Sequence, residues 1–268
     1  MSPAQQTVQA RAEILKLARL LHCSPERLDY LEAVPPEEIR QLRDRVTDLL
    51  FDAHDATLSR LVAASRLLPV ALVALMGERA FGPMLSARLA GRLDPERAVE
   101  AAARLSAPFL AEVAVELDPR RAKTALAGIP PDRVAEVTRE LARRGEFVAM
   151  GRLVGYLPPE TLAVAVTALT DGELLRAAFV MEEKERVEEL AEALGEQRLE
   201  AIIEAAERED LWVEAIDLLG HLGPERQAAL VEIARERLGD DRQAEVLELV
   251  REAGLLERPG PLRDLLTS

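Results

Sequence analysis

The apolar residues of this chain recur at helical spacing over most of its length. The first stretch carries four of them three or four positions apart, on one face of a helix: Ile14, Leu17, Ala18 and Leu21. A longer stretch from Pro36 keeps one apolar face for about seven turns, until Pro69 interrupts it. Ala and Leu are frequent, whereas strand-favouring residues are sparse. The pattern predicts an all-α fold.

A twelve-residue repeat begins at Leu93 and runs through four consecutive units: LDPERAVEAAAR, LSAPFLAEVAVE, LDPRRAKTALAG and IPPDRVAEVTRE. Each unit opens with Leu or Ile, continues with proline or an acid, and then carries aliphatic residues. The proline suits the first position of a helix, which leaves about eight helical residues, or two turns. Because such short helices are marginal alone, we expect them to stack on their neighbours.

A larger repeat appears when residues 117–156 are superposed on 157–196. Apolar positions coincide, and Gly155 falls on Gly195, where each glycine suits a left-handed helix end. We therefore predict a right-handed superhelical solenoid of short helices, comparable to HEAT repeats. Its expected parts are an N-terminal helical cap with one long helix (1–92), the short-helix repeats (93–196), and acidic helices that continue the stack (197–268).

The short units in 93–140 and 157–180 resemble the intracellular N-terminal domain of MgtE-type magnesium transporters. That domain is a superhelix of short helices, and the motor-switch protein of the flagellum has a related one. The resemblance rests on repeat periodicity, covers roughly a quarter to a third of the chain, and implies a curved helical stack. The sequence has no CBS-like segments and no transmembrane bundle, and the family's magnesium-binding acids match no particular residues here.

Composition and charge narrow the function classes. The 34 basic and 48 acidic residues give a net charge of −14, which repels phosphate backbones, so we expect no nucleic-acid partner. The single cysteine, Cys23, fits a reducing compartment, and the polar N-terminus lacks a signal-peptide core. The most apolar stretch, 61–76, is shorter than a membrane span and is interrupted by Arg66. We therefore expect a cytoplasmic protein without stable membrane insertion.

Two groups of residues are candidate binding sites. An apolar ligand would lie in a cavity lined by Leu68, Leu72, Met76, Phe81, Met84, Phe147, Met150 and Tyr156, unless these side chains simply form the core. Three aspartates share one face of the predicted long helix: Asp48, Asp52 and Asp55. Their carboxylates could bind a divalent cation, and the alternative is an ordinary solvated acidic face.

No catalytic motif stands out in this sequence. It contains no nucleophile elbow, phosphate-binding loop or zinc-protease motif, and it has only three histidines. We therefore expect a non-enzymatic scaffold or adaptor, without a cofactor, that binds a protein partner on the concave face of the solenoid. A carrier of a hydrophobic small ligand and a divalent-cation sensor are the alternatives, and homo-oligomerisation remains open.

Overall fold

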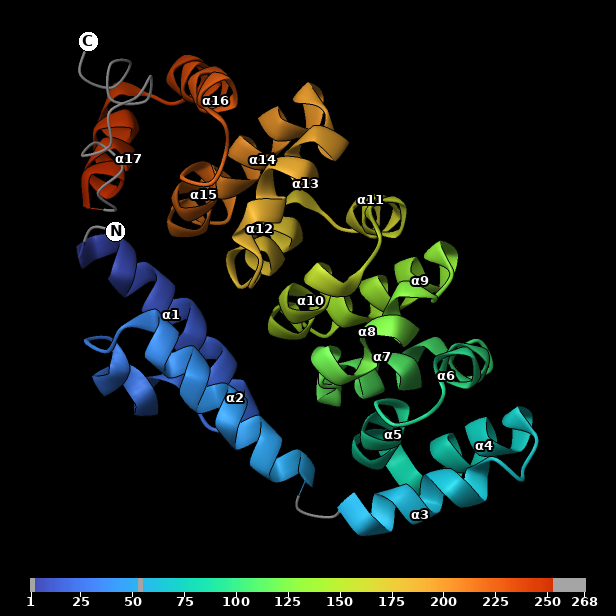
Figure 1. The fold of residues 1–268 in the computed structure, drawn as a ribbon. Helices are drawn as coiled ribbons and strands as arrows, with labels where there is room; N and C mark the ends of the chain where they lie inside the picture. Colours follow the sequence, from blue (N-terminus) through green and yellow to red (C-terminus); the bar gives the residue numbers. More distant parts are fainter. Residues whose placement is uncertain (1–2, 53–54, 253–268) are drawn as a thin grey trace. The chain divides into compact units, whose positions relative to one another are not determined.

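The computed structural model describes residues 3–52 and 55–252 of the chain (Figure 1). Throughout these residues the chain is helical, with seventeen α-helices, four shorter helical segments and no strand. The predicted all-α fold is therefore confirmed.

Contacts divide the chain into two compact units. Unit 2 is Asp44–Leu169, and unit 1 joins Met1–Arg43 to Thr170–Ser268. Neither unit coincides with a segment expected from the sequence, because residues up to Arg43 group with the C-terminal helices and not with residues 44–92.

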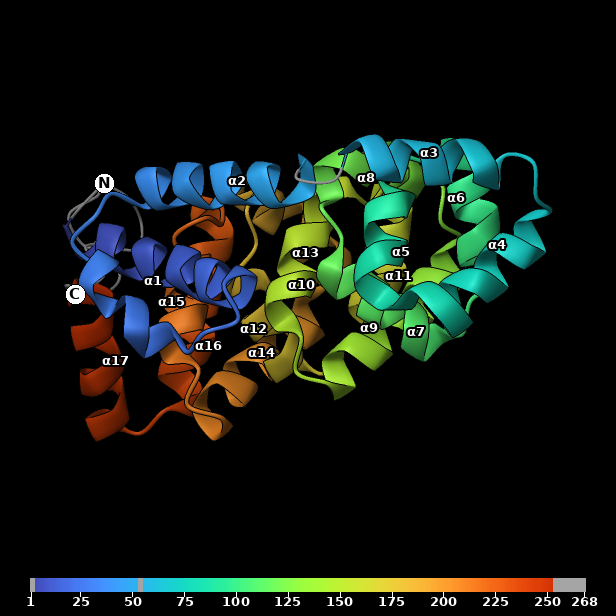
Figure 2. The same ribbon diagram turned by 90° about the horizontal axis from the view of Figure 1, so that it is seen from below.

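In unit 2 most helices pack against the second α-helix after them. The helices are α2 (Pro36–Asp52, which begins in unit 1), α3 (Asp55–Ser65), α4 (Val70–Met76), α5 (Gly82–Ala90), α6 (Pro95–Ala102), α7 (Ala107–Glu116), α8 (Pro119–Ala127), α9 (Pro131–Arg143), α10 (Phe147–Leu153) and α11 (Pro159–Thr167). One row consists of α3, α5, α7, α9 and α11 (Figures 1 and 2). A second consists of α4, α6 and α8, followed by the short η3 (Val154–Tyr156). In this second row α8 packs on η3, and α10 packs on α9 and η3. Each twelve-residue repeat thus forms one short helix.

The helix boundaries follow from local capping residues. Pro95, Pro119 and Pro131 each occupy the first position of a helix, where the missing N–H is not needed. The Ser106 hydroxyl accepts a hydrogen bond from the Phe109 N–H at 3.4 Å at the start of α7. Thr170 makes the same kind of cap for α12 (Asp171–Phe179), which has no proline at its start, by accepting a hydrogen bond from the Glu173 N–H at 3.4 Å.

The two glycines matched in the larger repeat behave differently. Gly195 has φ +74°, as expected for a left-handed helix end, whereas Gly155 lies inside η3 and does not adopt a positive φ. Gly145, directly after α9, has φ +71°. The prediction for Gly155 was wrong, because in that part of the repeat the left-handed residue follows the preceding helix.

Unit 1 contains the first and the last helices. They are α1 (Pro3–Leu20), η1 (Pro25–Leu31), the start of α2, α12 (Asp171–Phe179), η4 (Lys184–Arg186), α13 (Val187–Leu194), α14 (Glu196–Arg208), α15 (Trp212–Leu219), α16 (Pro224–Arg237) and α17 (Asp240–Glu252). Here α12, α14 and α16 form one row, α15 packs on α17 and α12, and α1 packs on α15. The predicted long helix is described as α2 and α3; its continuity depends on residues 53–54, which lie outside the described residues.

Arginines of the repeat connect the start of one helix to the end of another. Arg97 Nη2 donates to the Ser65 and Leu68 carbonyl oxygens at 2.9 and 3.0 Å, beyond the end of α3. Arg133 makes the equivalent bonds three repeat units later, to the carbonyls of Ala102 and Leu105. Carbonyls at a helix C-terminus lack intrahelical partners and lie at the negative end of the helix dipole. The arginine of LDPER and of IPPDR therefore caps a helix about thirty residues earlier.

Glutamines perform the same task in unit 1. Gln227, in the first turn of α16, donates to the Leu219 and Leu222 carbonyls at 3.0 and 2.9 Å. Gln243, in the first turn of α17, donates to the Arg235 and Leu238 carbonyls at 2.8 and 2.7 Å. Polar side chains thus satisfy the ends of short helices in both units.

Removing one arginine cap should destabilise unit 2. We expect Arg97→Met to lower the free energy of unfolding by about 1.5–3 kcal/mol, the contribution of hydrogen bonds that involve a charged group. Arg104→Met is the matched control, because Arg104 bonds the carboxylate and the carbonyl of Glu100, four residues earlier, instead of an earlier helix, and its side chain is 44% exposed. Urea unfolding followed by circular dichroism measures both. Equal losses in the two variants would contradict the capping role.

Candidate functional site

The aspartates predicted to bind a cation are paired with arginines. Asp48 Oδ1 lies 3.0 Å from Arg120 Nη2 and 3.3 Å from Arg121 Nη2, and Asp55 Oδ1 lies 2.7 Å from Arg92 Nη2. The Asp52 side chain lies outside the described residues. Among the residues that the structure describes, no three His, Cys, Asp or Glu side chains are grouped as a metal site would require. The arrangement favours a neutralised surface over a cation site.

The apolar residues predicted as one ligand site are divided by the fold. Leu68, Met76 and Phe81 line a cavity of about 140 Å³ in unit 2. Leu72 and Met84 are 40% and 51% exposed and do not line it. The other three candidates are on α10 and η3, away from this lining: Phe147, Met150 and Tyr156. Met150 is buried, so packing is its role.

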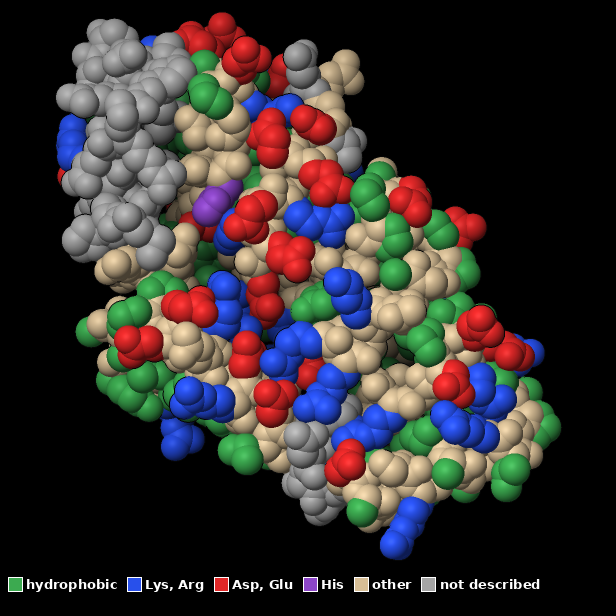
Figure 3. All heavy atoms as spheres, in the orientation of Figure 1, with side chains coloured by type: hydrophobic (Ala, Val, Ile, Leu, Met, Phe, Trp, Pro, Cys, Tyr) green, Lys and Arg blue, Asp and Glu red, His purple; other side chains and the backbone are tan. Residues whose placement is uncertain are grey.

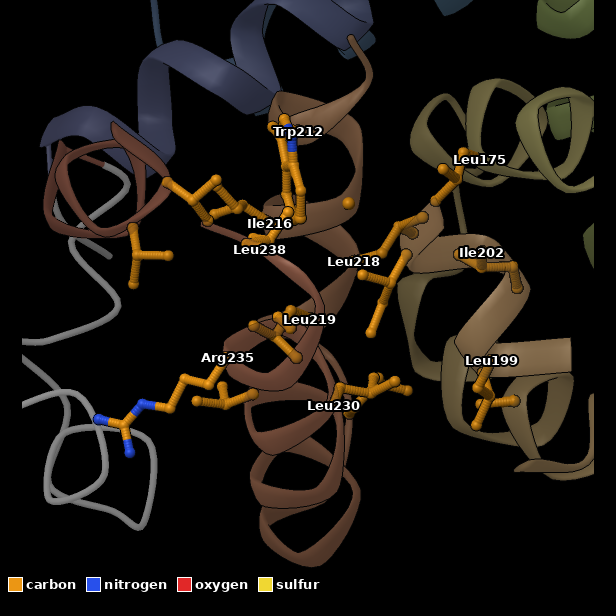
Figure 4. Close-up of a pocket in the computed structure, with 18 of the residues that line it drawn as sticks. Leu175, Leu199, Ile202, Trp212, Ile216, Leu218, Leu219, Leu230, Arg235 and Leu238 are labelled. Atoms are coloured by element: carbon orange, nitrogen blue, oxygen red, sulfur yellow. The ribbon is translucent and has the colours of Figure 1, made fainter. Parts of the chain in front are cut away.

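A larger cavity lies in unit 1, among α12 to α17. Its volume is about 420 Å³, within the range of roughly 300–1,000 Å³ typical of small-molecule sites. Figure 4 shows the aliphatic and aromatic side chains that surround it, including Leu175, Leu199, Ile202, Trp212, Ile216, Leu218, Leu219, Leu230 and Leu238. The polar lining residues are Arg235, Asp240 and Gln243. The geometry therefore offers a site for an apolar molecule.

This cavity was not predicted from the sequence, because the prediction relied on positions where aromatic and methionine residues gather. The signal lay in the aliphatic stripe of the acidic helices, which includes Leu190, Leu199 and Ile203. Only 3% of the chain is aromatic, and Trp212 is the one aromatic lining residue. Helices that face one another mainly with Ala, Val, Leu and Ile leave space that larger rings would fill.

A buried group of charges holds the N-terminal helices in unit 1. Glu13 on α1 pairs with Lys16 Nζ at 2.7 Å and with Arg43 Nη1 at 2.9 Å, and Arg43 Nη1 also lies 2.9 Å from Glu182 Oε1. Glu13, Lys16 and Arg43 are only 2%, 3% and 5% exposed. We call these four residues the buried ion network. It joins α1, the start of α2 and the segment between α12 and α13.

A further cation, Lys184, lies two residues after Glu182 of the buried ion network. Lys184 Nζ pairs with Asp217 Oδ2 on α15 at 2.7 Å and donates to the Phe179 carbonyl, also at 2.7 Å, at the end of α12. Glu182 and Lys184, two residues apart, thus connect their segment to α2 and to α15.

Burial and charge oppose each other in these pKa values. Burial alone would raise the pKa of Glu13, but the charges of Lys16 and Arg43 outweigh it and the pKa is lowered. Burial lowers the pKa of Lys16 in spite of Glu13, and burial also lowers that of Lys184 in spite of Asp217. Every member has an opposite charge beside it, which favours a structural role over a catalytic one.

An exposed apolar and basic surface lies at the start of unit 2. Leu67 is 88% exposed, Leu75 50% and Leu72 40%, and Arg60 and Arg79 are exposed as well. We call these five residues the apolar–basic face. The lower right of Figure 3, where α3 and α4 lie in Figure 1, shows hydrophobic side chains in green among blue basic and red acidic ones. Scattered exposed leucines are common on proteins, but several around one short helix indicate an interaction surface.

The same region contains an apolar helical stretch. Within the described part of the chain, Val70–Ala90 is the one helical stretch with the length and hydropathy of a membrane span; its mean hydropathy is 1.2. Core helices of soluble proteins share these properties, so no membrane role follows from them.

No protein-family model, curated protein or solved structure matches this chain.

Acid should release the buried ion network. Because folding lowers the pKa of Glu13, its carboxylate stabilises the fold above the unfolded value of about 4.3, and this stabilisation is lost as the pH falls through the folded value. We expect Glu13→Gln to lower the free energy of unfolding by about 3 kcal/mol at neutral pH, since the buried Lys16 loses its paired carboxylate and Arg43 loses one of two. The difference from wild type should shrink as the pH falls through the folded pKa of Glu13.

Urea unfolding at a series of pH values measures this effect. Glu192→Gln, which removes an exposed carboxylate from α13 in the same unit, is the control and should follow the wild-type curve. A Glu13→Gln curve that runs parallel to wild type at all pH values would show that the network is not the origin of the acid dependence.

Proposed function

We propose that this protein is a non-enzymatic helical-repeat adaptor that binds a protein partner through the apolar–basic face. The observation that carries the proposal is the exposure of Leu67, Leu72 and Leu75 around a seven-residue helix, beside exposed arginines. A terminal repeat that must only remain soluble needs a polar outer surface. Apolar side chains there are better explained by a surface that a partner covers.

The repeat architecture proposed from the sequence fits this function. Contacts between every second helix, and arginine caps that recur from Arg97 to Arg133, are what a solenoid of paired short helices requires. A right-handed superhelix, the likeness to the MgtE N-terminal domain and binding on a concave face stay predictions. We propose the solenoid as the scaffold and the apolar–basic face as its binding surface.

Charge specifies the chemistry of the partner. Residues 55–92 contain five arginines and only two acids, although the whole chain has a net charge of −14. Residues 182–252 contain 22 acids and nine basic residues. The partner that fits the apolar–basic face is therefore a protein with an apolar ridge between acidic residues, because complementary charge speeds association and buried apolar side chains provide most of the affinity.

Acidic substitutions on this face should abolish partner binding. In affinity purification from native cytosol, we expect the double variant Leu72→Glu/Leu75→Glu to recover about tenfold less, or still less, of a stoichiometric partner than the wild type. Quantitative mass spectrometry measures the recovered amount. Leu49→Glu is the control, because Leu49 is also an exposed leucine of unit 2, at 74%, but is outside this face. High salt should weaken the wild-type interaction.

Three results would contradict the proposal. The partner could persist with the double variant, or it could be lost equally with the Leu49→Glu control. Sedimentation with phosphatidylserine vesicles, absent for the double variant, would instead identify an anionic membrane surface as the ligand of this face. Circular dichroism verifies that all variants are folded.

A further inference from the structure

We infer that the cavity among α12 to α17 is a binding site for one linear acyl chain, an activity beyond the proposed adaptor function. The first observation is its extent. The lining begins with Leu174 and Leu175 on α12 and continues through all the helices up to Val250 on α17. A cavity of about 420 Å³ lined almost entirely by aliphatic side chains has room for a flexible hydrocarbon chain, which can adapt to its outline.

The second observation is that polar groups beside the cavity already have protein partners. The Trp212 indole N–H donates to Glu207 Oε2 at 2.9 Å, and the Gln243 amide donates to the Arg235 and Leu238 carbonyls. A polar ligand inside would lose its hydrogen bonds to water and gain few in return. A hydrocarbon chain needs none.

The third observation indicates which end of the ligand carries a charged group. Among the described lining residues Arg235 is the only basic one. Its Nη1 lies 3.5 Å from Glu232 Oε1, and in Figure 4 its guanidinium points away from the leucines while its methylene groups remain beside them. Asp240 is exposed at the first residue of α17. A fatty acid with its chain among Leu199, Ile216 and Leu230 could place its carboxylate near Arg235, where the opposite charge favours it.

A single natural tryptophan makes the site directly measurable. Trp212 is the only tryptophan of the chain and lines the cavity, so a bound dansyl-undecanoic acid should quench it by energy transfer. Palmitic acid should displace the probe and restore the emission. Mass spectrometry of the protein under native conditions should show fatty acid bound after purification from cells.

A cavity-filling substitution separates binding from non-specific adsorption. Ala215 lines the cavity from α15, and Ala215→Phe should weaken probe binding about tenfold, since the ring occupies the space of the chain. Ala229→Phe is the control: Ala229 is exposed on α16 and does not line the cavity, so its binding should match wild type. Thermal unfolding verifies that both variants fold.

Several outcomes would overturn the inference. One is the absence of energy transfer from Trp212 to the probe in the full chain. Another is probe binding by a folded Ala215→Phe variant that equals probe binding by the wild type. Binding only by a chain that ends at Glu252 would show that the following residues occupy the cavity instead. If Ala215→Phe fails to fold, palmitic acid must raise the melting temperature of the wild type for the inference to stand. Probe binding by Leu72→Glu/Leu75→Glu should equal wild type, so this test is independent of the adaptor proposal.

Discussion

The structure depends on how helices of two or three turns satisfy their ends. A helix of eight residues, such as α6, leaves a large share of its N–H and C=O groups without intrahelical partners. Packing alone does not remove that cost when the ends are partly buried. Arg97 and Arg133 place a positive charge at the C-terminus of an earlier helix, and Gln227 and Gln243 supply neutral donors for the same purpose. Stacking and capping are therefore one device, because the side chain that starts a helix also completes an earlier one.

Local features of the fold could be predicted from the sequence. The repeat units that open at Leu93, Leu105, Leu117 and Ile129 each give a helix that begins two residues later, because proline or a cap fixes the start within a few residues. The association of α1 with α15 could not be predicted in this way. The N-terminal helices are also joined to the segment after α12 by Glu13, Arg43 and Glu182, which look like ordinary surface charges in the sequence.

The candidate sites could be predicted from the sequence even less well than the fold. Residue type alone predicts Met150 and Phe81 as parts of one ligand site, yet they belong to different parts of unit 2. A cavity depends on how the faces of packed helices meet and not on residue type alone. Leu199 and Leu230 resemble any other core leucines, although they line the larger cavity. The aspartates of the long stretch were correctly recognised as an acidic group, but the repeat arginines that neutralise Asp48 are about seventy residues away.

The buried charges of unit 1 contribute more to the specificity of packing than to stability. Replacement of a buried ion pair by apolar side chains often costs little stability, so Glu13, Lys16 and Arg43 are not needed simply to hold helices together. Aliphatic faces as uniform as these could slide past one another with small losses, since Ala and Leu at neighbouring turns are nearly equivalent. A shift of α1 by one turn would carry Glu13 and Lys16 away together and break the buried bond from Glu13 to Arg43, which is costly because both partners are buried. The buried ion network thus selects a single register for an N-terminal segment that the apolar pattern leaves undetermined.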